Sequence, residues 1–210
     1  MAFNMDKLIA ELSNKRKIFV SESDFQLELA WLIKELYPNA VVRMEYCPQF
    51  DAAMHIDILV IVDGKWIPIE LKYKTKGCQK FVDGEFYHLK THSAKDVNCY
   101  AYLKDIQRIE TIKENAPAFQ EGYAILITNE LSYTKAPASK DVNYYAFSIH
   151  EGAIKSGTMD WSEKTGDGTK GRDCRCPIVF NGKYEMKWST YSKVDSTNTG
   201  VFKVLVNKVV

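Results

Sequence analysis

The sequence predicts a single α/β domain in which helices flank a mixed central sheet. Three patterns carry this prediction: a helical apolar period at about 22–37, strand-like runs between 40 and 74, and a second helical period at about 94–115 that leads into a continuously apolar run at 123–128. The expected order is therefore helix, three strands, helix, strand. The 210 residues, 46% of them hydrophobic, suffice to build one sizeable core.

The first helix is expected at about 22–37. Ser21, followed three residues later by Asp24, has the pattern of an N-terminal cap. Tyr37-Pro38 ends the helix, because the residue before a proline disfavours helical backbone. The apolar side of this helix comprises Phe25, Leu29, Leu32, Ile33 and Leu36.

Three strands are expected to follow. Residues 40–46 form the first, and a proline-containing connection leads to the two runs of the stretch 55–72. Asp63-Gly64 separates these two runs and is a strong signal for a two-residue hairpin turn. Such a turn pairs Val62 with Lys65 and fixes the register of both strands.

This register gathers charged side chains on one face of the hairpin and apolar ones on the other. It places Asp57 opposite Glu70, and His55 opposite Lys72. Directly opposed residues have Cβ atoms about 4.5–5.5 Å apart, so two carboxylates there repel unless a cation or a proton intervenes. Two carboxylates and water suit Mg²⁺, and a neighbouring lysine can orient that water, so the parts for phosphodiester hydrolysis are present. The alternative is a solvated face on which Lys72 forms a salt bridge with Glu70 or Asp57.

The second helix, about 94–115, is expected to open at Ser93 and to end at Asn115-Ala-Pro117. The run 123–128 then fits a strand that is buried on both faces. Beyond it we expect a C-terminal β-rich extension over about 150–210. A further strand is expected at 144–149, just before this extension. The extension itself should contain a long loop at about 155–176, which includes Cys174 and Cys176, and closing strands at 178–188 and 201–207.

An acid-x-Lys motif occurs at Asp63-Gly-Lys65, Glu70-Leu-Lys72 and Glu185-Met-Lys187, but only Glu70 has an aligned acid across a predicted hairpin. With Asp57, this motif resembles the PD-(D/E)xK nuclease superfamily, whose core has the same order of helices and strands. The stretches 21–26, 69–75 and 102–110 are similar to an uncharacterised microbial subfamily of it. The resemblance covers residues 20–130 and is thinner over 150–210. His55-Ile56 stand where many members have a proline before the first acid.

The resemblance implies a restriction-endonuclease-like fold and a metal-dependent nuclease acting on nucleic acid, with DNA favoured. By the same resemblance, Asp57, Glu70 and the carbonyl of Leu71 hold Mg²⁺ or Mn²⁺, and Lys72 assists the attacking water. Glu22 matches the acid that the family places near the metal on the first helix. A non-catalytic nucleic-acid-binding or partner-binding module with a nuclease-like fold is the alternative function.

Five further residues are candidates for substrate contacts: Gln26, Glu45, Lys74, Lys76 and Arg108. Each has a structural alternative. Glu22 and Glu45 can be a helix-dipole partner and a solvated strand acid, and Arg108 can form an ion pair with Asp105, which is the favoured reading for that pair. The lysines belong to a basic stretch from Lys72 to Lys95 that either follows a phosphate backbone or is a solvated loop.

Composition and charge limit the partners and the cellular location that the protein can be expected to have. A net charge of +1 gives no global basic field, so nucleic acid would have to be attracted by local clusters. No run of about 18 apolar residues is present to span a bilayer, and charged residues occupy the N-terminus where a signal peptide needs an apolar core. Five cysteines without paired spacing favour reduced thiols. We therefore expect a cytoplasmic protein without a membrane partner, in which a homodimer is compatible with the sequence.

Overall fold

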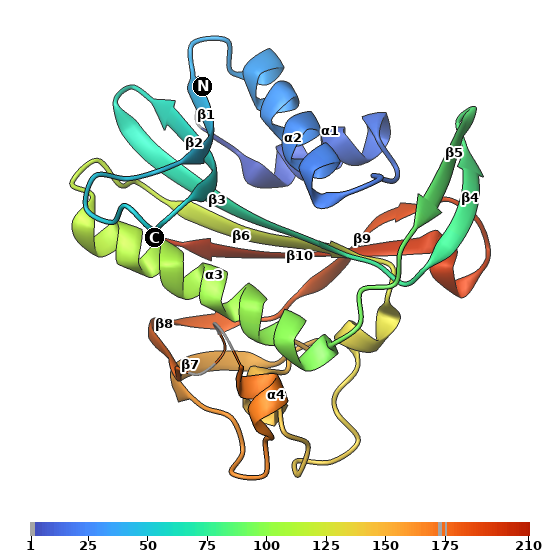
Figure 1. Ribbon diagram of the computed structural model, residues 1–210. Helices are drawn as coiled ribbons and strands as arrows, with labels where there is room; N and C mark the ends of the chain where they lie inside the picture. Colours follow the sequence, from blue (N-terminus) through green and yellow to red (C-terminus); the bar gives the residue numbers. More distant parts are fainter. Residues whose placement is uncertain (1–2, 172–173, 175) are drawn as a thin grey trace.

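The computed structural model describes residues 3–171, 174 and 176–210 and is built around a six-stranded mixed sheet (Figure 1). The strand order is β1-β2-β3-β6-β10-β9. β3 and β6 are parallel, and every other neighbouring pair is antiparallel. The strands are β1 (Val41–Tyr46), β2 (Ile56–Val62), β3 (Lys65–Lys74), β6 (Gly122–Thr128), β9 (Trp188–Lys193) and β10 (Val201–Val209). The predicted α/β class and the mixed central sheet are confirmed.

Helices cover both faces of this sheet (Figure 1). α1 (Met5–Lys15) and α2 (Glu22–Leu36) lie on one face, and α3 (Lys95–Asn115) crosses the other. Each face has its own apolar core, and every residue of β6 is buried, as predicted for 123–128. The face that carries Asp57 and Glu70 is therefore not solvated: α3 covers it, so the solvated-face alternative is wrong.

Local signals explain where the two predicted helices begin and end. The Ser21 hydroxyl accepts a hydrogen bond from the Asp24 N–H at 3.1 Å, and the Tyr37 N–H donates to the Ile33 carbonyl at 2.8 Å, which confirms the expected bounds of α2. The cap expected from Ser93 is not formed. Ala94, with φ of 61°, precedes α3 instead, and no side chain caps this helix.

The β2–β3 register is confirmed, from Val62 opposite Lys65 to Ile58 opposite Ile69. Asp63 and Gly64 both have positive φ, 50° and 76°, as a two-residue turn of this hand requires. The backbone ladder ends at Ile58, so the next pair expected from the register does not continue as regular sheet. Beyond this point the Asp57 side chain, rather than its backbone, bonds to β3.

Several elements differ from the sequence-based expectation. The basic stretch contains a hairpin, β4 (Cys78–Val82) and β5 (Glu85–Leu89), around a second Asp-Gly turn at 83–84. Residues 145–147 form a short 3₁₀ helix, η2 (Tyr145–Phe147), rather than a strand, because Phe147 packs against Trp161 with ring centroids 4.6 Å apart. The strand predicted at 178–188 is divided: its first part pairs in a separate two-stranded sheet. The remaining elements are β7 (Ile154–Met159), α4 (Asp167–Lys170), β8 (Ile178–Glu185), η1 (Leu131–Thr134) and η4 (Asn198–Gly200).

The loop predicted at 155–176 thus contains β7 and α4. Three of its residues, 172, 173 and 175, lie outside the described part of the chain. Cys174 is buried and its carbonyl accepts a hydrogen bond from the Trp161 indole at 2.6 Å, whereas Cys176 is exposed. Among the helices of the described residues, none combines the length and the apolar character that crossing a bilayer needs.

Gly122 lets α3 pack closely against the sheet, which leads to a stability prediction. A Cβ placed on Gly122 would lie 2.3 Å from the Ile109 Cγ2 and 3.2 Å from Pro68. We expect Gly122→Ala to lower the free energy of unfolding by about 2 kcal/mol, because the helix and strand must move apart. Gly166→Ala, where nothing lies within 4 Å, is the matched control. Denaturant unfolding of both variants tests this, and equal stabilities would contradict it.

Candidate metal and active site

Asp57 lies where the β2–β3 ladder stops. Its Oδ2 accepts a hydrogen bond from the Leu71 N–H at 2.6 Å, so the side chain takes the place of the missing strand partner. The pKa of Asp57 is raised to about 6: burial is the largest cause, Asp105 and Glu22 also raise it, and Lys72 and the Leu71 N–H lower it. Desolvation is therefore the main reason why this carboxyl holds its proton to a higher pH than an ordinary aspartate in the metal-free protein.

Glu70, on the neighbouring strand, is fully buried, with 0% of its surface exposed. Its Oε2 accepts from the Arg108 Nη1 at 2.8 Å, but its Oε1 is buried and has no hydrogen-bond partner. Burial raises the pKa of Glu70 well above its ordinary value, and Asp105 adds to this while Arg108 opposes it. A buried carboxylate oxygen without a partner is costly, so this atom needs a proton or a cation.

Lys72 does not form the salt bridge expected with Glu70 or Asp57. Its Nζ lies 2.9 Å from the Asp105 Oδ2 and donates to the Leu71 carbonyl at 3.1 Å. Burial lowers the pKa of Lys72, but the surrounding carboxylates, Asp105 first, outweigh burial and raise it above its ordinary value. Lys72 is therefore a permanent cation at neutral pH, suited to orienting water or stabilising negative charge.

Asp105 and Arg108 reach the site from α3. The expected ion pair between them is only marginal, at 3.9 Å, because each makes a shorter contact across to β3. Asp105 is almost fully buried, and burial raises its pKa. The sequence analysis did not predict the contact of Asp105 with Lys72. A signal was present, because Asp105 is a carboxyl among helix residues that are all buried, Tyr102, Leu103 and Ile106, and a buried carboxyl needs a partner.

The N-terminal half of α2 completes one side of the site. Glu22 accepts from the Tyr73 N–H at 2.7 Å and from the Lys74 Nζ at 3.0 Å, so it does more than complement the helix dipole. Gln26 Nε2 donates to the Asp57 carbonyl at 2.7 Å and to the Glu45 carboxylate at 2.8 Å. All three candidates, Glu22, Gln26 and Glu45, are thus brought to the ends of β2 and β3.

Glu45 has an unusual backbone. Its φ is 50°, although it lies within β1, and it is skipped in the ladder between Met44–Ile58 and Tyr46–Ile56. A non-glycine residue in this region carries strain, which the surrounding structure must hold in place. In this conformation the carboxylate of the exposed Glu45 accepts a hydrogen bond from Gln26.

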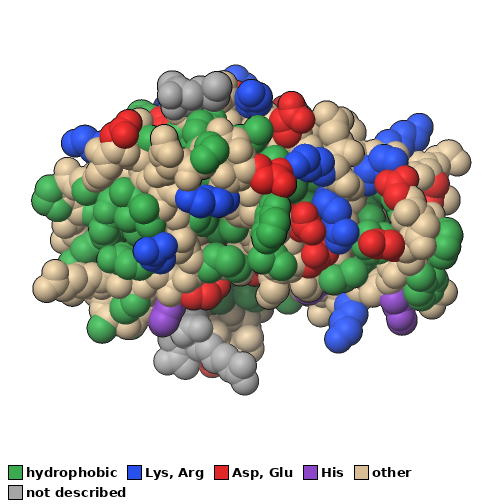
Figure 2. Space-filling model, turned by 90° about the horizontal axis from the view of Figure 1, so that it is seen from above, with side chains coloured by type: hydrophobic (Ala, Val, Ile, Leu, Met, Phe, Trp, Pro, Cys, Tyr) green, Lys and Arg blue, Asp and Glu red, His purple; other side chains and the backbone are tan. Residues whose placement is uncertain are grey.

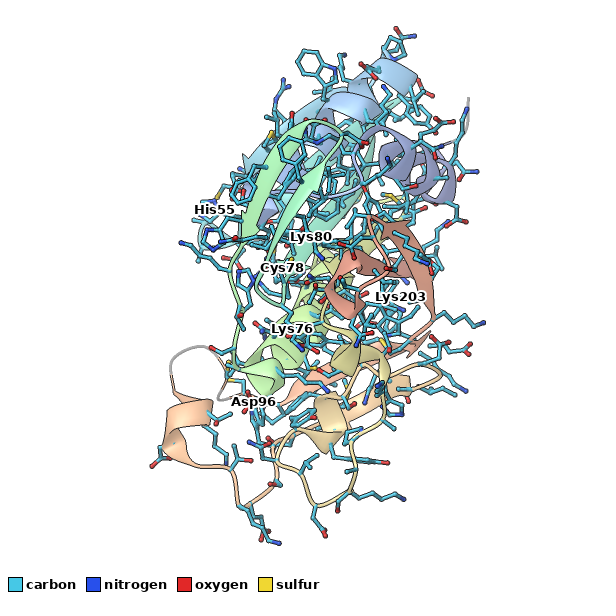
Figure 3. All side chains as sticks on the ribbon, turned by 90° about the vertical axis from the view of Figure 1, so that its right-hand side faces the viewer. His55, Lys76, Cys78, Lys80, Asp96 and Lys203 are labelled. Atoms are coloured by element: carbon cyan, nitrogen blue, oxygen red, sulfur yellow. The ribbon has the colours of Figure 1, made fainter. Side chains whose placement is uncertain are left out.

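Half of the six lysines in the predicted basic stretch are paired with carboxylates inside the molecule. Lys80 lies 2.5 Å from Asp195, Lys74 contacts Glu22, and Lys72 contacts Asp105. Within the described residues, Lys76, Lys90 and Lys95 have no ion pair, although Lys95 donates to the Ser132 carbonyl. Figure 3 labels Lys76, which lies in the connection from β3 to β4, and Lys80, which lies within β4.

Acidic and basic side chains are also interspersed on the face that carries α1 and α2 (Figure 2). An attraction for polyanions must therefore come from a few free cations rather than from a broad field. Of the two lysines predicted to contact substrate, Lys76 is free to do so, while Lys74 is already paired with Glu22.

The donor atoms at this end of β2 and β3 fit a divalent cation in charge and in chemical type. Five carboxyl groups face three cations, which leaves an excess of two negative charges if all are ionised. In the described residues, no three His, Cys, Asp or Glu side chains are arranged to hold an ion by themselves. Two carboxylates, a backbone carbonyl and water nevertheless match what Mg²⁺ accepts, and among them the Glu70 Oε1 is buried without a hydrogen-bond partner. The charged groups are Glu22, Glu45, Asp57, Glu70 and Asp105, with Lys72, Lys74 and Arg108.

Comparison of the chain with known protein families, with curated proteins and with solved structures finds no match. The interpretation of this site therefore depends on its own geometry and chemistry.

Proposed function

We propose that this protein is a metal-dependent nuclease that hydrolyses phosphodiester bonds, in DNA above all, on a restriction-endonuclease-like core. The observation that carries the proposal is the buried, unpartnered Glu70 Oε1 beside Asp57 and Lys72. The excess of carboxylates in this site suits it to bind a cation, and the ammonium of Lys72 suits it to stabilise a phosphate. Apart from the β4–β5 hairpin inserted between β3 and α3, the order α2-β1-β2-β3-α3-β6, in which β6 runs parallel to β3, is also the order expected of a PD-(D/E)xK core.

In this proposal Asp57, Glu70 and the Leu71 carbonyl would hold Mg²⁺ or Mn²⁺. The ion, when bound, polarises the phosphate and lowers the pKa of its bound water. Lys72 orients the attacking water and stabilises the charge that develops on the phosphate. To free the Leu71 carbonyl, the Lys72 ammonium must turn away from it while keeping its contact with Asp105.

Arg108 and Glu22 position the groups around the proposed metal, and Arg108 also stays accessible to substrate. Arg108 occupies one oxygen of Glu70 and thereby turns the other toward the proposed metal position. Glu22 holds the Tyr73 N–H, one residue beyond Lys72, and so fixes the strand that carries the lysine. Arg108 remains about one-third exposed, so a phosphate can still approach it.

A second function has a specific observation in its favour. Lys72 and Arg108 already contact the acids at 2.9 and 2.8 Å, which partly neutralises the site without a metal. A nucleic-acid-binding module without catalysis would use the same surface with Lys72 and Arg108 still paired to Asp105 and Glu70.

Metal-dependent cleavage separates the two functions. We expect Mg²⁺ or Mn²⁺ to support nicking of plasmid or cleavage of oligonucleotides, and Ca²⁺ to bind with little turnover, since its longer and looser coordination positions water poorly. Single- and double-stranded DNA and RNA are each incubated with the three ions and analysed by gel electrophoresis. An absence of cleavage with Mn²⁺ on every substrate, together with retained binding, would favour the binding module.

A further inference from the structure

A pocket of about 380 Å³ lies on the same side of the sheet as α3 and shares β1, β3 and α3 with the proposed active site. It is formed by the end of β1, the connection that follows it, the start of β3 and the C-terminal end of α3. Its lining residues are Tyr46, Gln49, Phe50, Trp66 and Asn115 to Ala118.

The lining combines three aromatic rings with two amide side chains and contains no charged side chain. Tyr46 and Trp66 meet edge to face, with centroids 5.5 Å apart at 87°, and Phe50 is 38% exposed. Aromatic rings stack on planar heterocycles, and the amides of Gln49 and Asn115 can donate to and accept from their edges. An uncharged planar ring with polar edges is the ligand that this chemistry fits.

The walls of the pocket are held in place before any ligand binds. The Trp66 N–H donates to the Ala118 carbonyl at 2.7 Å, and the Trp66 carbonyl accepts from the Gln120 N–H at 3.0 Å. A separate apolar cluster that includes Met54 and Ile112 supports the pocket from below. A preformed pocket loses little conformational freedom on binding, which favours affinity.

The pocket is close to the proposed metal position along two elements. Trp66 precedes Glu70 by four residues on the same face of β3, roughly 13 Å at the usual strand rise. Asn115 follows Arg108 by seven residues of α3, about 10 Å along the helix. Tyr46 follows directly on Glu45. A strand whose phosphate lies at the acids can therefore reach the pocket with a neighbouring base.

We propose that this pocket binds one unstacked nucleobase of the substrate strand, which makes single-stranded or locally unpaired nucleic acid the preferred substrate. The inference rests on the proposed nuclease function. A base inside a duplex cannot enter such a pocket without leaving its stack, at a cost that is smallest where the strand is already unpaired.

Strand binding tests the proposal in Ca²⁺, which limits turnover. The probes are an oligothymidylate and an abasic strand with the same number of phosphates. Stacking of one base contributes about 1–3 kcal/mol, so we expect Phe50→Ala to weaken oligothymidylate binding about 5- to 160-fold and to leave abasic binding unchanged. Trp31→Ala, which removes an exposed aromatic ring on α2, is the matched control and should change neither. An equal loss on both strands, or no loss on oligothymidylate, would overturn the proposal.

Tryptophan fluorescence separates failure of the pocket from failure of the nuclease proposal. Deoxyadenosine should quench the parent protein and Trp31→Phe but not Trp66→Phe, and deoxyribose should quench none of them. Quenching that requires Trp66, without binding of either strand, would support the pocket and reject the nuclease function. Quenching that is unchanged in Trp66→Phe, or absent from the parent protein, would reject the pocket even if the protein cleaves DNA.

Discussion

Glu70→Ala will abolish Mg²⁺-dependent cleavage, and Lys72→Ala will reduce it by about 10²- to 10³-fold, the size of effect seen when a single charge-stabilising group is removed. The two losses differ in cause. In the proposed site the buried, unpartnered oxygen of Glu70 would contact the cation, so its removal should also eliminate metal binding. Lys72 forms its ion pair with Asp105 and not with Asp57 or Glu70, the two carboxylates proposed to bind the metal. The Lys72→Ala variant should therefore keep metal binding. Cleavage rates and isothermal titration with Mn²⁺ distinguish these outcomes.

The control for Lys72 is Lys65→Ala, which changes the same residue type on the same strand at an exposed position. It should cleave at the rate of the parent protein. A Lys72→Ala variant that matches the parent at saturating metal and substrate would show that Lys72 has no part in catalysis.

Loss of folding must be separated from loss of catalysis in this experiment. Removing Lys72 leaves Asp105 buried without its closest cation, and breaking a buried pair on one side costs about 3–5 kcal/mol. Lys72→Ala combined with Asp105→Asn removes the stranded charge. This double variant should regain stability and remain inactive, which a purely structural role of Lys72 does not predict.

The part of the site that could be predicted from sequence is the part set by local rules. The Asp63-Gly64 turn fixes the pairing of β2 with β3, so the proximity of Asp57 and Glu70 follows from counting residues. The cap at Ser21 likewise places Glu22 in the first turn of α2. The same turn signal at Asp83-Gly84 would have predicted the β4–β5 hairpin.

The contacts that could not be predicted depend on how distant elements pack. Asp105 and Arg108 are spaced as an ion pair, and only the position of α3 over β3 divides them between Lys72 and Glu70. The pairing of Lys80 with Asp195 spans the chain in the same way. Period-based reasoning also fails at 145–147, where aromatic packing holds the chain in a 3₁₀ turn.

Burial of Asp57 leads to a prediction about stability that does not require any activity. In the metal-free protein the pKa of Asp57 is raised from 3.8 to about 6, with desolvation as the main cause. A carboxyl whose pKa is raised by folding stabilises the folded state below its unfolded pKa, and this contribution is lost as the pH rises through the folded value. The loss therefore falls between about pH 4 and pH 6, and at 1.36 kcal/mol per unit it approaches about 3 kcal/mol.

Asp57→Asn removes the titrating carboxyl, and the new amide oxygen can still accept a hydrogen bond from the Leu71 N–H. We therefore expect Asp57→Asn and the parent protein to be about equally stable near pH 4, and the variant to be more stable by up to about 3 kcal/mol at pH 8 with a chelator present. Asp63→Asn, at an exposed turn position, is the control and should follow the parent at both pH values. Guanidinium unfolding at a series of pH values measures the difference.

Adding Mg²⁺ at pH 8 should reverse the order, because an ion that binds only the folded state stabilises it according to its concentration relative to its Kd. The parent and Asp63→Asn should gain stability with Mg²⁺, and Asp57→Asn should gain little, since it lacks one of the two carboxylates. Parallel pH profiles of parent and Asp57→Asn in chelator would show that Asp57 is not strained by burial. An equal Mg²⁺ gain in both would place the ion elsewhere, because the Asp57 carboxylate would then contribute nothing to holding it.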